Sequence, residues 1–325
     1  MIIRTDRMGD VILSTPVLTA VKKKYPQAKT TMLVSGYTVD VVSGHPDLDH
    51  VMVDDPEGEH KGFRGLLKLA KSLRTARFDA VLVLHPTSRL AWLCFLAGIP
   101  LRVGTGYRAY SILFNRRVFQ HRKKSGRHEL ELNLDLAQAI GAPLKEIEFK
   151  FHIPQESSVR IDQWLTEQNL NGKHFIVLHP GSGGSALDWP LEYFGDLANQ
   201  LQKKHGLPVV VTGSGKEAPL IDELSKLAPK IIRADGQFSI KELAALLKKA
   251  DVMLANSTGP LHLAVAVGTR VVGLYCTLPA CHPDRWGPYS STATVLTPPA
   301  DADYNSDQNP MRLLPVDKVL KAIIK

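Results

Sequence analysis

The first residues able to carry out chemistry lie near the start of the chain, in residues 4–10 (RTDRMGD). Ile2 and Ile3 before this segment and a helix-like stretch after it place it in the loop between a strand and a helix. Gly9 permits a tight turn and a close approach of the backbone to a ligand. Asp10 falls at the start of the helix, where its carboxylate could serve as a general base. The alternative is structural: Asp10 caps the helix and pairs with a neighbouring arginine.

A second candidate is the glycine- and serine-rich segment of residues 179–185 (HPGSGGS), which follows a predicted strand. Such a loop presents free backbone N–H groups beside a helix, an arrangement that suits a phosphate or diphosphate. The glycine spacing matches neither a Walker A loop nor a GxGxxG fingerprint. A flexible connector is the alternative. The residues that we expect to contact the anion are Gly181, Ser182, Gly183 and Ser185.

A third loop, residues 256–262 (NSTGPLH), follows another predicted strand. Ser257 or Thr258 could cap the helix that begins at Gly259, and Pro260 fits its first turn. Hydroxyls and amides there form a further anion site, although His262 could equally be a core histidine. A fourth turn contributes Thr212, Gly213 and Glu217, and the Glu217 carboxylate could accept ribose hydroxyls.

Strand-like and helix-like segments alternate along the whole chain, which predicts parallel sheets with helices on both faces. At roughly 100–200 residues per domain, the length suggests two domains. We expect two doubly wound α/β domains, residues 1–155 and 156–311, with a last helix in 312–325 that packs back on the first. The predicted strands are 2–3, 31–34, 51–53, 80–84, 101–103, 174–179, 209–212, 231–234, 252–255 and 271–275. The predicted helices are 11–25, 66–73, 90–96, 130–140, 159–165, 190–205, 217–227, 239–249, 259–267 and 315–324.

The net charge of +8 is unevenly distributed. Residues 1–160 hold 24 basic and 16 acidic side chains, whereas the remainder holds 16 of each. Residues 105–128 carry seven basic and no acidic side chains. This stretch is either a solvated loop or a platform for an anionic glycolipid at a membrane face. It contains no recognised nucleic-acid-binding module, so we expect no nucleic-acid partner. Its candidate binding residues are Arg108, Arg116, Arg117, Lys123 and Lys124.

Cysteine content and apolar runs limit the class of protein. Three cysteines are too few for a disulfide framework, and Cys276-x4-Cys281-His282 lacks a second ligand pair for structural zinc. The longest apolar run, residues 90–101, is shorter than the about 20 residues of a membrane span. Charges within residues 1–10 exclude an uninterrupted apolar signal segment there. We therefore expect a chain that is cytoplasmic or docked on a membrane from the cytoplasmic side.

The three loops in their order along the chain resemble the ADP-heptose:lipopolysaccharide heptosyltransferase family. The resemblance rests on residues 4–16, on residues 179–181 with Trp189-Pro190, and on residues 256–264, and it extends over nearly the whole chain. It implies a GT-B fold, in which two Rossmann-like domains face each other across a cleft. It also implies an ADP-heptose donor, a lipopolysaccharide-core acceptor, inversion at the anomeric carbon and no metal or other cofactor.

The same resemblance assigns roles to individual residues. Asp10 matches the proposed base that deprotonates the acceptor hydroxyl, and Arg7 and Gly9 lie in the same acceptor-side motif. Residues 257–262 match the loop that holds the donor diphosphate, and Glu217 matches a ribose-binding acid. The division of these groups between two domains is what a two-domain group-transfer enzyme requires.

Two positions depart from the family pattern. Leu187 stands where many relatives have Lys or Arg, and Ser257 stands where many have Asp. A missing cation on a developing diphosphate must be compensated by amide dipoles. Other readings are therefore transfer from another nucleotide sugar, a nucleotide-sugar 2-epimerase, or a weakly active or non-catalytic sugar-binding homologue. A dehydrogenase is disfavoured by the absence of a proper GxGxxG.

Overall fold

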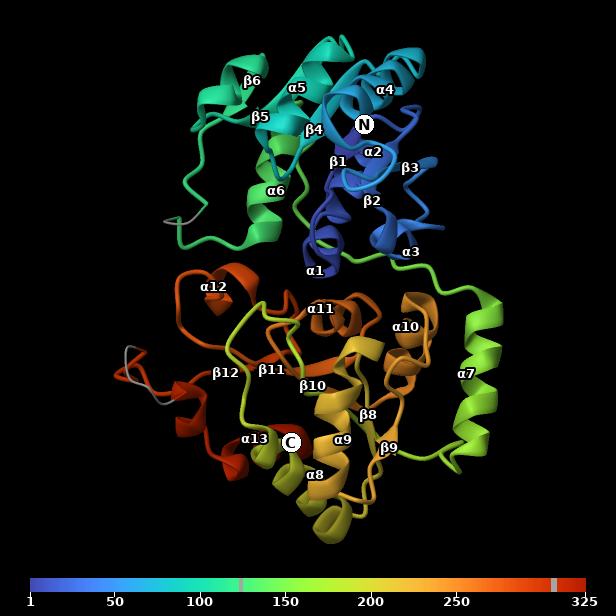
Figure 1. Ribbon diagram of the computed structural model, residues 1–325, viewed down its shortest axis with the longest axis vertical. Helices are drawn as coiled ribbons and strands as arrows, with labels where there is room; N and C mark the ends of the chain where they lie inside the picture. The colour runs from blue at the N-terminus through green and yellow to red at the C-terminus, as the bar shows by residue number, and fades with distance from the viewer. Residues whose placement is uncertain (123–124, 305–308) are drawn as a thin grey trace. The chain divides into compact units, whose positions relative to one another are not determined.

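The chain divides into two compact units, residues Met1–His152 and Ile153–Lys325, in the computed structural model (Figure 1). The structure describes residues 1–122, 125–304 and 309–325. Each unit contains one six-stranded parallel sheet with helices packed on it. None of the helices in the described ranges is long and apolar enough to cross a membrane.

The first sheet has the strand order β3-β2-β1-β4-β5-β6, with every neighbouring pair parallel. Its strands confirm those expected from the apolar runs and add β6, which pairs with β5 inside the basic stretch. The strands are β1 (Ile2–Ile3), β2 (Thr31–Ser35), β3 (His50–Asp54), β4 (Ala80–Val83), β5 (Leu101–Thr105) and β6 (Arg116–Val118).

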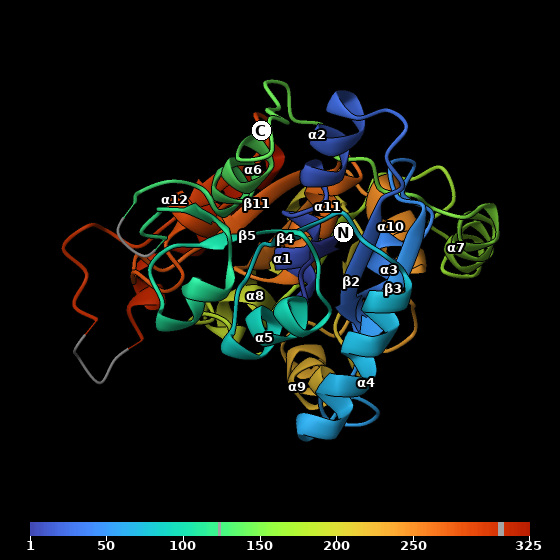
Figure 2. The ribbon, with the colours of Figure 1, turned by 90° about the horizontal axis from the view of Figure 1, so that it is seen from above.

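Helices cover both faces of this sheet (Figure 2). Figure 2 shows α2 and α6 on one face and α4 and α5 on the other, where Leu66, Leu73 and Leu93 join the buried core. The expected helix over 11–25 is divided, because Pro16 has no N–H and residues 13–15 form a turn instead. The helical segments are α1 (Met8–Ile12), α2 (Pro16–Lys24), η1 (Gly36–Thr38), α3 (Val39–Val42), α4 (Gly62–Thr75), α5 (Ser88–Leu96), η2 (Ala109–Leu113) and α6 (Glu129–Gln138).

The second sheet repeats the same topology, with the order β12-β11-β10-β7-β8-β9. Its core joins strand residues such as Leu178 and Leu254 to the buried faces of α8 and α9. The strands are β7 (Ile176–His179), β8 (Val209–Val211), β9 (Ile232–Arg233), β10 (Val252–Asn256), β11 (Arg270–Leu274) and β12 (Thr294–Leu296). The helical segments are α7 (Gln155–Glu167), α8 (Leu191–His205), η3 (Gly215–Glu217), α9 (Ala218–Leu227), α10 (Ile240–Lys249), α11 (Gly259–Ala266), α12 (Pro283–Trp286), η4 (Pro310–Leu313) and α13 (Val316–Ile324).

Two features of the second unit differ from the sequence-based expectation. The last helix, α13, belongs to this unit, whereas we expected it to pack on the first domain. Val319, Leu320 and Ile323 of α13 join the second core, and the helix contacts α8 and β11. In addition, a disulfide joins Cys276 and Cys281, so two of the three cysteines form a single short-range bridge.

In both sheets the strand order reverses beside the first strand. β1 pairs with β2 on one side and β4 on the other, and β7 likewise lies between β8 and β10. In open parallel sheets, ligands bind beyond the carboxyl ends of the strands at such a reversal point. The loops after β1 and β4, and those after β7 and β10, are therefore where each unit is expected to bind a ligand.

Candidate active site

A buried arginine organises the loop after β1. Arg4 follows β1 directly and is only 1% exposed. Its guanidinium lies 2.6 Å from Asp6 Oδ1, 2.5 Å from Asp10 Oδ1 and 3.0 Å from Glu129 Oε1. Asn133 Oδ1 accepts a further bond of 3.3 Å from Arg4 Nη1. Because Glu129 and Asn133 belong to α6, Arg4 ties the loop after β1 to a helix more than a hundred residues later.

Asp10 has the environment of a carboxylate with raised proton affinity. Burial raises the pKa of Asp10, and the ion pair with Arg4 opposes this shift without cancelling it. Asp6 behaves in the opposite way. Burial would raise its pKa, but Arg4 and His85 outweigh that effect and lower it. Two carboxyls on one loop thus have pKa values moved in opposite directions, which is a mark of sites that use one of them as an acid or base.

His85, in the loop after β4, is a candidate that the sequence patterns did not reveal. Its Nδ1 atom lies 3.0 Å from Asp6 Oδ2, and its side chain is 53% exposed. Leu84 N donates to Ile3 O across the neighbouring strand ends, which brings the two loops together. His85 therefore adds a titratable group to the site at the β1/β4 reversal point.

The expected acceptor-side residues are placed as follows. Arg7 is exposed, whereas Gly9 is buried in α1. Arg108, Arg116 and Arg117 are exposed in the segment from η2 to β6. Lys123 and Lys124 lie outside the described residues.

Part of the basic stretch is neutralised by acidic residues of α6. Arg122 pairs with Glu129, and Arg127 Nη1 lies 2.8 Å from Asp135 Oδ2. The stretch is therefore less positive than its sequence suggests. The exposed rings of Tyr107 and Phe119 pack edge to face, with centroids 5.6 Å apart, and Tyr107 also contacts the His121 ring. These aromatic groups follow β5 and β6, so they lie at the carboxyl edge of the sheet.

In the second unit, a buried asparagine joins the loops after β7 and β10. Asn256 is the last residue of β10 and is fully buried. Its Nδ2 atom donates to Pro180 O at 2.6 Å, and its Oδ1 atom accepts from the Trp189 backbone N–H at 3.0 Å. Both ends of the glycine- and serine-rich loop are thereby fixed to the end of β10. The sequence indicated this loop, but not the role of Asn256.

Hydrogen bonds within the glycine- and serine-rich loop shape it further. Ser185 Oγ lies 2.6 Å from Ser182 O and 2.9 Å from Ser257 O, and Ser182 Oγ donates to Ala186 O at 3.2 Å. Gly183 and Gly184 are exposed and have φ angles of 58° and 74°, which favour glycine. Because the serine hydroxyl protons are engaged inside the loop, the backbone N–H groups of these glycines are its best donors to an anion.

Glu217 lies directly beside the same loop. A Cβ atom added to Gly181 would be 1.9 Å from Glu217 Oε1, so the carboxylate rests against the glycine backbone. Its other oxygen, Oε2, accepts bonds of 2.7 Å from both Ser214 N and Ser214 Oγ. Gly213 lies close to Ile221 and Glu217. Thr212, by contrast, is buried, and its Oγ1 atom lies 3.0 Å from His179 Nδ1. Thr212 therefore contacts the residue at which the loop begins.

The loop after β10 leads into α11 as the sequence predicted. Gly259 and Pro260 form the first turn of this helix, and Thr258 precedes it as the N-cap residue. The Thr258 side chain makes no capping bond within the described part of the chain. Its hydroxyl therefore does not occupy the backbone N–H groups of the first turn of α11. Ser257 and His262 are both buried. Leu187, at the position of the expected cation, packs on the second core.

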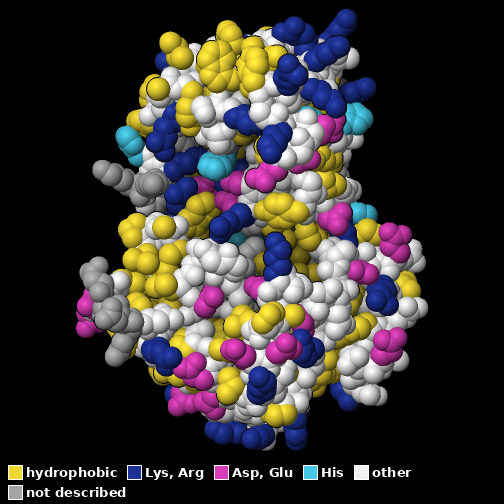
Figure 3. Space-filling model, viewed as in Figure 1, with side chains coloured by type: hydrophobic (Ala, Val, Ile, Leu, Met, Phe, Trp, Pro, Cys, Tyr) yellow, Lys and Arg dark blue, Asp and Glu magenta, His cyan; other side chains and the backbone are white. Residues whose placement is uncertain are grey.

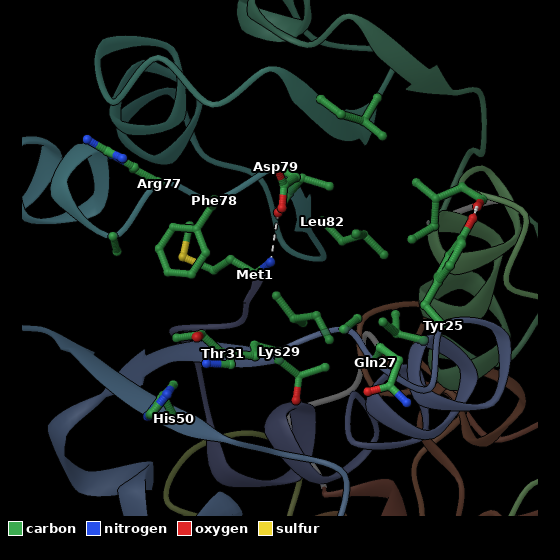
Figure 4. A pocket seen from close by; sticks show the side chains of 18 of the residues that line it. Met1, Tyr25, Gln27, Lys29, Thr31, His50, Arg77, Phe78, Asp79 and Leu82 are labelled. Atoms are coloured by element: carbon green, nitrogen blue, oxygen red, sulfur yellow. Dashed lines mark hydrogen bonds between the residues drawn. The ribbon is translucent and has the colours of Figure 1, made fainter.

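A large cavity of about 980 Å³ lies away from these residues except Arg116, which lines it (Figure 4). It is lined by residues that begin the strands of the first sheet, among them Thr31, His50 and Leu101. Lys29 and Arg77 also line it. Since strands run in parallel, this cavity lies at the amino edge of the sheet, opposite the edge where Asp10 and His85 are found. The cavity is not part of the candidate site, and Arg116, at the start of β6, lies at this amino edge and not beside Asp10.

Comparison with known proteins agrees with this geometry. A family model described as glycosyltransferase family 9 (heptosyltransferase) matches residues 66–311. The chain belongs to glycosyltransferase family 9. The lipopolysaccharide core heptosyltransferase OpsX of Haemophilus influenzae is 27% identical over 306 residues, covering 91% of this chain and 83% of the relative. Lipopolysaccharide heptosyltransferase 3 of Escherichia coli K12 is 27% identical over 281 residues, covering 82% of this chain and 79% of the relative.

Solved structures establish the GT-B-like fold of this family 9 glycosyltransferase. The glycosyl transferase family 9 protein of Veillonella parvula superimposes with a TM-score of 0.88 at 22% identity, covering 99% of this chain and 94% of that one. Escherichia coli heptosyltransferase WaaC with ADP gives a TM-score of 0.77 at 18% identity, covering 99% and 98%. The expected fold class, two doubly wound α/β units, is confirmed.

Several residues of this glycosyltransferase site were not predicted as site residues from the sequence. Arg4 and Asn256 lie within the predicted loops, and their near-complete burial is what distinguishes them. Glu129 and His85 are distant in sequence from the loops that they contact. An isolated polar residue directly after a buried strand was the one available signal for Asn256 and His85.

Proposed function

We propose that this family 9 glycosyltransferase transfers a heptose from ADP-heptose to the inner core of lipopolysaccharide, with Asp10 as the general base. The observation that carries the proposal is the position of Asp10 beside the β1/β4 reversal point, with a pKa raised by burial. A carboxylate of raised pKa accepts a proton more readily at neutral pH than an ordinary one. The names of the relatives supply the substrate classes. OpsX is a lipopolysaccharide core heptosyltransferase, and WaaC was solved with ADP.

The donor is assigned to the second unit. The exposed amides of Gly183 and Gly184 and the N-terminal turn of α11 would hold its diphosphate through N–H dipoles. Glu217 Oε1, at the edge of this loop, would accept the ribose hydroxyls. Because Leu187 cannot supply a cation at its position, we assign the stabilisation of the departing ADP to these amides.

The reaction proposed is a direct displacement with inversion. Asp10 takes the proton of the acceptor hydroxyl, and the oxygen forms a bond to the anomeric carbon of the heptose. The bond from that carbon to the diphosphate oxygen breaks on the opposite face, and ADP leaves with the electron pair. Arg4 holds the Asp10 carboxylate in place through the bond at 2.5 Å. No metal ion takes part in these steps.

The acceptor is assigned to the first unit. Arg7, Arg108 and Arg117 are exposed cations that suit the phosphate and carboxylate groups of an inner-core glycolipid. Such an acceptor is anchored in a membrane, so we place the enzyme at the cytoplasmic face as a peripheral protein.

One assay tests this function. The purified protein is incubated with a panel of nucleotide sugars, with and without a Kdo–lipid A acceptor, and both nucleotide release and the glycolipid product are measured. We expect acceptor-dependent ADP release from ADP-heptose, together with a heptose-bearing product of inverted anomeric configuration. If another nucleotide sugar is turned over and ADP-heptose is not, the donor assignment is wrong. Conversion of UDP-N-acetylglucosamine without any acceptor would instead indicate an epimerase.

A further inference from the structure

The helical layer formed by α4, α5 and η2 has an unusual outer surface. Between Glu59 and Glu129 the sequence contains fifteen Lys and Arg residues and a single acidic residue, Asp79. Within the same range lie several large hydrophobic side chains that the fold leaves exposed. Cations and exposed apolar groups thus occur together on the first unit.

The exposed apolar side chains come from neighbouring elements. Phe63 is 68% exposed, Trp92 and Phe95 are each 47% exposed, and Ile112 is 74% exposed. Leu67 is 42% exposed one turn after Phe63. Contacts between α4 and α5, and between α5 and η2, make these elements one continuous layer. We call the surface carrying Phe63, Leu67, Trp92, Phe95 and Ile112 the α4–α5 face.

The apolar side chains of the α4–α5 face do not belong to the buried core of the first unit. The core-facing sides of α4 and α5 are occupied by other residues, such as Leu66, Leu73 and Leu93, which are buried on the sheet. Trp92 and Phe95 pack edge to face with ring centroids 5.9 Å apart. Figure 3 shows hydrophobic side chains gathered over α5, with Lys and Arg side chains beside them over α4.

Cations lie beside these rings. The Arg102 guanidinium lies 5.6 Å from the centroid of the Phe95 ring. Arg64 and Lys71, on the outer side of α4, form no ion pair with any residue in the described ranges. Lys68 is paired with Glu59, which also lies at this surface. The face therefore combines exposed apolar side chains with cations beside them.

We propose that the α4–α5 face docks this enzyme on an anionic lipid bilayer, with Phe63, Trp92 and Ile112 inserted among the headgroups. Exposed aromatic and aliphatic groups beside Lys and Arg are typical of surfaces that lie in a membrane interface. A second copy of the chain is a poorer occupant, because an isologous contact would place the same cations against each other. Nucleic acid would satisfy the cations but would leave Ile112 and Phe63 without apolar partners.

This inference rests on the proposed function in one respect only, which is the reason why the α4–α5 face lies on the unit that we assign to the acceptor. Arg108, assigned to the acceptor, directly precedes η2, and Ile112 lies within η2. A membrane bound at this face would therefore lie close to the acceptor-binding residues of the same unit. Binding to lipid is measured without donor or acceptor, so failure of either proposal can be recognised separately.

The first test is co-sedimentation of the full-length protein with phosphatidylcholine–phosphatidylglycerol vesicles and with pure phosphatidylcholine vesicles. We expect binding to the anionic vesicles that weakens as salt is raised. The double variant Phe63→Ser/Trp92→Ser should bind at least about tenfold more weakly. Its matched control, Val159→Ser/Leu313→Ser, removes residues that are 47% and 53% exposed on the second unit and should bind like the wild type.

The charge contribution is tested with Arg64→Gln/Lys71→Gln against Lys226→Gln/Lys230→Gln. Each cation near an anionic bilayer strengthens binding by about fivefold. The first pair should therefore lower the affinity for anionic vesicles, and the control pair on the second unit should not. Circular dichroism spectra of all variants must match the wild type for the comparison to count.

A direct readout of insertion comes from tryptophan fluorescence. Trp164 and Trp189 are buried and Trp286 is partly exposed on the second unit, whereas Trp92 is 47% exposed on the α4–α5 face. Bromine-labelled lipids in the vesicles should therefore quench Trp92. The quenching should disappear in Trp92→Phe, a variant that keeps an aromatic ring. Equal vesicle binding by Phe63→Ser/Trp92→Ser and its control, or no quenching of Trp92, would overturn the proposal. The proposal would also be overturned if the protein did not bind vesicles and the Phe63→Ser/Trp92→Ser variant differed from the wild type in oligomeric state or in binding to an RNA homopolymer.

Discussion

Arg4 Nη2 and Asp10 Oδ1 lie 2.5 Å apart, and the same guanidinium also contacts Asp6 and Glu129. Burial disfavours the charged guanidinium, but the three carboxylates outweigh it and raise the pKa of Arg4 above its usual range. Arg4 is therefore a permanent cation shared among more than one anion. Burial raises the pKa of Asp10, and the ion pair with the shared Arg4 does not cancel this shift.

Asp10→Asn should abolish catalysis while leaving donor binding intact. The amide is nearly isosteric but cannot accept the acceptor proton, so we expect transfer to fall by about 10²–10⁴-fold. ADP affinity, measured by calorimetry, should stay close to that of the wild type because ADP is assigned to the second unit. Asp40→Asn, an exposed carboxylate on α3, is the matched control. Wild-type turnover in Asp10→Asn would remove Asp10 from the base role.

The raised pKa of Asp10 predicts an acid limb in the pH–rate profile. Only the ionised carboxylate acts as a base, so kcat/KM should fall as the pH decreases through a value above about 3.9, the ordinary pKa of Asp. The profile of kcat/KM against pH for the wild type gives the midpoint. Any residual activity of Asp10→Asn should lack this limb. A limb of the same midpoint in that variant would assign the limb to a group other than Asp10.

The same shift predicts the effect of Asp10→Asn on stability. Because the folded-state pKa of Asp10 is raised, ionisation of this residue at neutral pH opposes folding, and the opposition is relieved as the pH falls through that pKa. Asp10→Asn should therefore be at least as stable as the wild type at pH 7. Its advantage should shrink at acid pH, where both side chains are neutral. Urea unfolding at the two pH values measures this, and a less stable variant at pH 7 contradicts it.

Arg4→Met should strongly destabilise the first unit. Removal of one partner from a buried ion pair typically costs about 3–5 kcal/mol, since the carboxylates remain buried without their cation. The loss should narrow at acid pH, where those carboxyls become protonated. Arg127→Met is the control, because Arg127 pairs with Asp135 at an exposed site and such a pair contributes about 0–1 kcal/mol. Equal losses in the two variants would show that Arg4 does not organise the site.

Gly181→Ala should displace Glu217 and weaken nucleotide binding. The added Cβ would lie 1.9 Å from Glu217 Oε1, so the carboxylate has to move. We expect ADP affinity to fall by about tenfold, the value of one lost hydrogen bond to a charged group. Gly215→Ala, in the neighbouring turn, adds a Cβ with no atom within 4 Å and should bind ADP normally. Unchanged affinity in Gly181→Ala would remove Glu217 from the ribose role.

The sequence by itself determined the alternation of strands and helices and the loops between them. Apolar runs such as residues 252–255, bounded by Gly, Pro and Asn, set these elements locally, since backbone preferences act over a few residues. The same local signals placed Asp10 at the helix start after β1, residues 181–185 in the loop after β7, and residues 257–260 at the start of the helix after β10. Where the local signal was weak, as in β6 and β12, the strands were missed, because their edge positions bury few apolar side chains.

Only the tertiary structure decided which of these groups act together. The strand order brings the end of β4 beside the end of β1, so His85 reaches Asp6 across about eighty residues. Glu129 reaches Arg4 from α6, and Asn256 reaches Pro180 from β10, by the same kind of long-range packing. The exposed rings of α4 and α5 likewise look like core residues in the sequence, since helical periodicity alone does not say which apolar face the sheet covers. Burial and pairing over such separations are properties of the packed sheet and not of local segments, which is why the partners of Arg4 and the α4–α5 face emerged only from the fold.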